Sequence, residues 1–313
     1  MIKVLMAFLL VLSSFQIFSL ESSITTEEIE NMSEEERKEA LRLSEIFSDV
    51  PDEDREMIIA FCSLDWKETG SHKLKQSNST ISLPEGYKLL IGEEANKGRK
   101  LTCDDLYDPN LEATVYDANF ENVILFENSQ EGYISVDDWE DIDPKSLLKS
   151  ISENTEKANR ERKKNDGGEL HVIGWIQEPV LDKHTNTVYW AIEAESINEG
   201  AIVNSIAIRL GRKGFEKLIW VSKKASYVPF GGHLDVMLRS HSFDPGYRYN
   251  DYKTGDKIAC YGIATLVAAT VGGKIVKAGG LAVIFKKLGG FIFAGIAALF
   301  YKFKNIFKRK KED

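Results

Sequence analysis

The sequence has few cysteines and lacks the motifs that mark common enzyme classes. Its three cysteines, Cys62, Cys103 and Cys260, form no CxxC pair, and no group of Cys and His residues has the spacing of a structural zinc site. Neither a GxSxG nucleophile elbow nor a Walker-type phosphate loop occurs. The sequence therefore predicts no catalytic residue, no metal ligand and no cofactor.

Long apolar runs are also missing. Residues 258–273 and 288–301 are uncharged, but each run is shorter than the ~20 residues that span a bilayer comfortably. Lysines flank the second run, and their side chains can reach the membrane–water interface, which lengthens the span that this run can cover. Residues 302–311 are basic, which favours the cytoplasmic side. We expect one C-terminal transmembrane helix held in lipid. A two-span hairpin is the alternative, because Lys286 and Lys287 otherwise lie outside.

The start of the chain has the order of a secretory signal. Lys3 precedes an apolar run at 4–12, and a candidate cleavage position follows Ser19. An uncleaved anchor is the alternative, because apolar residues continue to Leu20. In both cases the main domain faces outside the cytoplasmic (inner) membrane, as a single-pass protein with a cytoplasmic C-terminus.

Export bears on the cysteines. In an oxidising compartment Cys62 and Cys103 would be able to form a disulfide. Buried free thiols are the equally weighted alternative.

Negative charge predominates in the chain as a whole. The net charge of −9 argues against a nucleic-acid partner, and the 43% hydrophobic content is enough for a packed core. Residues 21–56 are strongly acidic, and Ser33 with Glu36 has the pattern of a capping box. We expect an acidic helical lead that is either a solvated helix or an arm for a partner.

The remaining pattern predicts an α+β fold in which helices pack on an antiparallel sheet. Residues 171–194 read as a hairpin with Trp175 and Trp190 buried on its two arms. Two further strands make it a four-stranded meander ending near 222. Other expected elements are strands at 122–126 and 132–136, strand and turn at 64–90, a short helix and loop at 93–108, and helices at 144–164 and 232–240.

Six segments follow from these patterns. They are a signal peptide at 1–20, an acidic helical lead at 21–63, an exported α+β domain at 64–255, an apolar or amphipathic helical segment at 256–287, a transmembrane helix at 288–304 and a basic cytoplasmic tail at 305–313.

Three groups of residues are candidates for chemistry, each with a structural alternative. His233, Asp235 and His241 would serve a hydrolase, but their spacing is not that of a metal site. Asp137, Asp138, Asp141 and Asp143 suggest calcium, although helix capping already explains Asp143. Asn159 and Arg162 would clamp an anion, or bind a neighbouring loop.

The loop at 242–253 is the best candidate for an interface. Tyr247, Tyr249 and Tyr252 alternate with Arg248 and an aspartate, and such loops bind partners or lie at the level of lipid headgroups. A packed covering loop is the alternative.

A family resemblance is carried by the order and spacing of short segments at 66–70, 83–87, 132–134, 137–138, 142–143, 159 and 162, 174–175, 179, 190–191, 210–214, 246–247 and 256–257. Through them the sequence resembles the family of bacterial membrane-anchored proteins called domain of unknown function 2167. The likeness covers roughly residues 64–271, with a departure at 96–117, where this chain has an irregular, charged stretch. It implies an exported domain with a C-terminal anchor and carries over no catalytic residue.

Together these patterns predict an uncharacterised, membrane-anchored protein of the bacterial envelope with a periplasmic domain that binds a ligand or another envelope protein. An envelope hydrolase that uses the His233, Asp235 and His241 region is the alternative.

Overall fold

The computed structural model describes residues 52–102, 107–118, 120–164, 168–197, 200–229 and 232–270. The predicted signal peptide, the membrane run at 288–304 and the basic tail lie outside these residues, as do residues 21–51 of the acidic lead and 271–287 of the apolar segment. Within the described part of the chain, no helix is long and apolar enough to cross a membrane.

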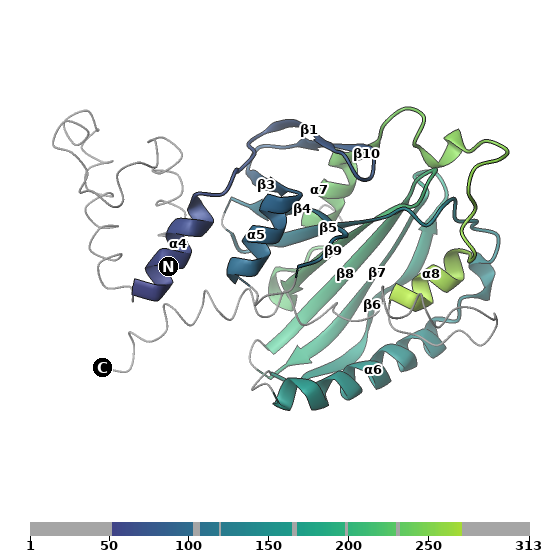
Figure 1. Ribbon diagram of the computed structural model, residues 1–313. Coiled ribbons are helices and arrows are strands. Elements are labelled where there is room, and N and C mark those ends of the chain that lie inside the picture. Colours follow the sequence, from purple (N-terminus) through teal and green to yellow (C-terminus); the bar gives the residue numbers. More distant parts are fainter. Residues whose placement is uncertain are drawn as a thin grey trace.

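A seven-stranded antiparallel sheet forms the centre of the domain (Figure 1). The α+β prediction is confirmed, and so is the four-stranded meander, which makes up one side of this sheet. In spatial order the strands are β3 (Tyr87–Ile91), β4 (Leu111–Asp117), β5 (Val123–Ser129), β9 (Phe215–Lys223), β8 (Gly200–Leu210), β7 (Thr187–Ser196) and β6 (Leu170–Asp182).

Helices cover one face of this sheet. A core cluster on that face joins Leu147 and Ile151 to Trp190 and Leu266. Trp190 is 1% exposed, as predicted, whereas Trp175 is only half-buried and donates a hydrogen bond to the Pro144 carbonyl at 3.1 Å. The covering helices are α4 (Asp52–Cys62), α5 (Glu93–Thr102), α6 (Pro144–Lys164) and α8 (Ile263–Thr270).

A small second sheet and one helix cover part of the other face (Figure 1). The chain returns late in the sequence to complete this layer, because β10 pairs with β2. The elements are β1 (Gly70–Leu74), β2 (Ser79–Leu83), β10 (His241–Phe243) and α7 (His233–Ser240). Helix α7 confirms the helix predicted at 232–240.

Two predictions about local structure were wrong. The expected strand at 132–136 is a single bridge, in which Tyr133 exchanges backbone hydrogen bonds with Lys257 and Ala259. The stretch at 96–117 contains β4, every residue of which is buried. The sequence pattern did not indicate a strand here, because charged residues flank it and because a glutamate such as Glu112 normally indicates a solvent-facing position.

Buried carboxyl groups hold the small sheet against the large one. Glu112 accepts hydrogen bonds from the backbone amides of Gln76 and Ser77, and it hydrogen-bonds with Glu216. Burial, with the nearby Glu112 charge, raises the pKa of Glu216 well above its usual range, and burial also raises that of Glu112. This shift favours the protonated form of Glu216.

The chain of polar contacts continues through hydroxyl groups. The Ser77 and Ser79 hydroxyls lie 2.7 Å apart, and His241 Nε2 lies 2.9 Å from the Ser79 hydroxyl. Burial lowers the pKa of His241 to about 3, so this imidazole is neutral near pH 7. We call the residues Ser77, Ser79, Glu112, Glu216 and His241 the polar seam.

We predict that Glu216→Gln stabilises the protein increasingly as pH rises from 5 to 8. Above the ordinary carboxyl pKa the unfolded chain releases a proton that folded Glu216 retains, so the wild-type free energy of unfolding falls with pH. For one proton this fall is at most about 1.4 kcal/mol for each pH unit. Denaturant unfolding of both proteins across this range measures the difference between their free energies of unfolding. The contribution of His241 cancels in this difference, because both proteins contain that residue. Glu178→Gln, at an exposed site, is the control. A difference that does not change with pH would contradict the protonated state of Glu216.

Candidate binding groove

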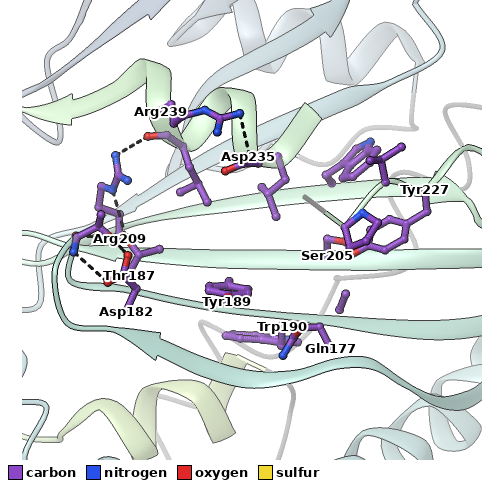
Figure 2. A pocket seen from close by; sticks show the side chains of 17 residues that line it. Gln177, Asp182, Thr187, Tyr189, Trp190, Ser205, Arg209, Tyr227, Asp235 and Arg239 are labelled. Carbon is purple, nitrogen blue, oxygen red and sulfur yellow. Dashed lines mark hydrogen bonds and ion pairs between the residues drawn. The ribbon is translucent and has the colours of Figure 1, made fainter. Parts of the chain in front are cut away.

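A groove opens on the face of the meander that the small sheet leaves uncovered. Its volume is about 270 Å³. Strands β6 to β9 form the floor, and α7 with residues 227–229 forms the opposite wall (Figure 2). The groove is built from segments distant in sequence.

Cross-strand register explains why the floor is hollow. One row across the four strands consists of Gln177, Ala191, Ser205 and Trp220, which are direct neighbours. Directly opposite residues point to the same face of a sheet. The two central side chains are small, so the row is low in its middle and tall at the Trp220 end.

The next row has a similar profile. Val180, Tyr189, Ala207 and Leu218 are paired in register, and the small Ala207 lies beside Tyr189. Figure 2 shows the Tyr189 ring lying on the floor beneath α7. Trp190, the next residue in the strand, points to the opposite face and into the helical core.

The roof combines apolar and charged side chains. On α7, Leu234 and Leu238 are one turn apart and line the groove. Asp235 and Arg239 are also one turn apart and form an ion pair of 2.8 Å (Figure 2). Their placement at the first and last turns of the helix agrees with the helix dipole.

Arg209 fixes the roof to the floor. Its guanidinium donates to the carbonyls of Leu238, at 2.6 Å, and His241, at the C-terminal end of α7. Its Nε donates to the Thr187 hydroxyl on the neighbouring strand at 3.3 Å. The position of α7 above the sheet therefore depends on this side chain.

Hydroxyl groups converge at the far end of the groove. The Tyr227 ring stacks on Trp220 with centroids 5.6 Å apart. Burial and the nearby Tyr189 raise the pKa of Tyr227. The buried Ser205 hydroxyl has no hydrogen-bond partner among the described residues. Tyr227 and Ser205 thus lie together at this end of the groove (Figure 2).

Apolar walls with a few convergent polar groups are typical of ligand sites. No His or Cys is among the described residues that line the groove.

The structure separates the residues proposed for hydrolysis. His233 Nδ1 lies 2.8 Å from the Tyr87 hydroxyl, Asp235 pairs with Arg239, and His241 is buried in the polar seam. Each residue has a different partner. Only Asp235 lines the groove.

The interface loop is largely packed against the domain. Tyr249 is buried and donates to the Ile134 carbonyl at 2.8 Å. Tyr133 stacks on it at 4.5 Å and contacts Tyr252 at 4.3 Å. Arg248 is exposed. Tyr247 is half-buried, with the Lys213 ammonium 4.8 Å from its ring centroid. A role in an interface stays a prediction for Tyr247, Arg248, Tyr249 and Tyr252.

The remaining candidates have structural partners. Asn159 exchanges two hydrogen bonds with the Leu170 backbone and accepts a third from Arg162, which fastens α6 to β6. Asp143 caps α6, and Asp138 accepts from the Ala264 amide. Among described residues, no group of three or more His, Cys, Asp and Glu is arranged to hold a metal ion.

The structure does not test the predicted disulfide between Cys62 and Cys103. Cys62 is buried in α4, and Cys103 lies outside the described residues, so their pairing stays a prediction.

Sequence reasoning missed the groove. None of Gln177, Tyr189, Ser205, Arg209 and Tyr227 stands out in the sequence. The available signal was the small side chains of Ala191, Ser205 and Ala207 among bulky strand residues, but their alignment requires the register.

The fold is that of an α+β domain with one large antiparallel sheet and a groove on one of its faces. The chain belongs to the family described as protein of unknown function (DUF2167), which matches residues 66–300 and confirms the resemblance seen in the sequence.

Other comparisons add little about function. The solution structure of cyanobacterial PsbP (CyanoP) from Synechocystis sp. PCC 6803 is similar with a TM-score of 0.35 and 9% identity, over 57% of this chain and 92% of that chain. Likeness at this level supports no functional conclusion. No curated protein matches the sequence.

Proposed function

We propose that this protein is an exported, membrane-anchored binding module whose groove above β6 to β9 holds a small ligand. The observation that carries the proposal is the hollow row of Gln177, Ala191, Ser205 and Trp220 beneath α7. Small side chains there leave space that a packed core would fill. Hydroxyl and carboxamide groups around that space offer hydrogen bonds to a ligand.

The surroundings of the groove support binding in a fixed frame. Strands supply the floor, and Arg209 ties the roof to it through three hydrogen bonds. Sites built on regular elements position their side chains better than sites on loops. The exposed Arg248, beside Tyr247, offers a second surface on which an envelope protein would dock.

The proposed location rests on the sequence. The signal-like start predicts export, and the uncharged run at 288–301 is followed by a basic tail. In this arrangement the groove faces outside the cytoplasmic membrane and the chain is held in lipid by its C-terminal helix.

We predict that a photo-crosslinking residue at Val228 captures a ligand in living cells. Val228 lies on the groove rim and is 51% exposed. A benzophenone side chain there should yield an adduct of defined mass by mass spectrometry of the intact protein. Ile173, which is 60% exposed and outside the groove lining, is the matched control position. Adducts of equal yield and mass at both positions, or none at Val228, would count against the groove.

We predict that the C-terminus is cytoplasmic and the domain is not. A reporter active only in the cytoplasm should work after Asp313, and a reporter active only outside should work after Ser222. Ala297→Lys should weaken anchoring, because a lysine at the centre of a membrane helix costs about 3 kcal/mol. Ala297→Leu is the control. A silent cytoplasmic reporter at Asp313, with an active exported one there, would replace the single span by a hairpin.

A further inference from the structure

Two aspartates and two arginines line the groove, and each of them already has a polar partner. Arg239 pairs with Asp235 at 2.8 Å, and Arg209 is committed to backbone carbonyls. Asp182 accepts from the Thr185 hydroxyl at 2.7 Å and from the His184 amide at 2.8 Å. A charged group brought into the groove would lose water and would have to compete with these partners for a counter-charge. The lining therefore favours a neutral ligand.

The uncharged groups have a different distribution. The Tyr189 ring lies on the floor beneath α7 (Figure 2). Leu234 and Leu238 of that helix also line the groove. The hydroxyls of Tyr227 and Ser205 lie toward one end, and the Gln177 carboxamide lies along the same side of the sheet. A matching ligand has an apolar face for the aromatic ring and hydroxyl groups along its edge.

The size of the groove limits the ligand further. Its volume of about 270 Å³ lies just below the range typical of sites for drug-sized molecules. One or two small rings would fill it.

We propose that the groove binds a neutral sugar ring, which packs its C–H face on Tyr189 and offers its hydroxyl groups to Tyr227, Ser205 and Gln177. This inference rests on the proposed binding function and names its ligand class. A sugar ring combines an apolar face with hydrogen-bonding edges, which matches both sides of the groove. Aromatic side chains supply large, rigid contact area for such a face.

The test is a titration of the full chain in lipid nanodiscs, since maltoside detergents would themselves supply a sugar. Glucose, galactose, mannose and N-acetylglucosamine are the neutral probes, measured by saturation-transfer NMR. Glucuronic acid and glucosamine are charged relatives of glucose. At least one neutral sugar should bind, and its charged relative should bind roughly tenfold or more weakly, because its charge would have to compete with the existing partners for a counter-charge.

Two variants locate the binding. Tyr189→Ala should abolish the sugar signal, and Tyr227→Phe, which removes only a hydroxyl, should weaken it roughly threefold or more. Tyr107→Ala, at a site 64% exposed and outside the groove, should leave it unchanged. If Tyr189→Ala unfolds, the result for Tyr227→Phe decides.

The outcomes separate this inference from the binding function. If no neutral sugar binds, or if charged and neutral sugars bind alike, the sugar assignment is wrong. An adduct at Val228 that proves to be a peptide would also overturn it while leaving the binding module standing. If the Val228 crosslinking and the sugar titration both gave no binding, the binding function and the sugar assignment would both be wrong.

Discussion

The register of the β6 to β9 meander is the constraint on which the rest of the structure depends. A shift of one residue in an antiparallel pair exchanges the two faces of a strand. In the observed register, Trp190 enters the helical core while Tyr189 faces the groove. The same pairings align Ala191 with Ser205, which creates the hollow floor. Core and groove are thus two consequences of one set of pairings.

Arg209 connects this floor to the polar seam. In the strand register, Arg209 on β8 lies opposite Glu216 on β9, and its guanidinium donates a hydrogen bond to the carbonyl of His241. The seam joins the small sheet to the large one, and the same guanidinium holds the end of α7. Burial lowers the pKa of Arg209, with Asp182 opposing the shift, and the group remains charged at neutral pH. Changes that loosen the polar seam would therefore alter the groove through Arg209, because this side chain is hydrogen-bonded both to His241 of the seam and to α7 above the groove.

The sequence was sufficient for elements whose signals are local. Asp143 and Pro144 mark the start of α6, and the polar turn before Thr187 separates two strands rich in β-branched and aromatic residues. It was insufficient for β4, where buried Glu112 resembles a surface residue. It also failed at Tyr133, where a strand-like run makes only one bridge.

The groove required information that no local pattern contains. Its floor comes from strand order and register, and its roof from a helix that follows the meander and folds back over it. His241 shows the opposite failure. Beside Asp235 and His233 it resembles a catalytic residue, but its imidazole is neutral and fully buried against Ser79.

The central claim is that the space between α7 and the sheet is occupied by a ligand in the cell. The most direct measurement is a high-resolution structure of the full chain purified from its native membranes without a competing sugar. Our account predicts non-protein density over the Tyr189 ring, within hydrogen-bonding distance of Tyr227. Density for a ligand elsewhere, with the groove holding only water, would contradict it.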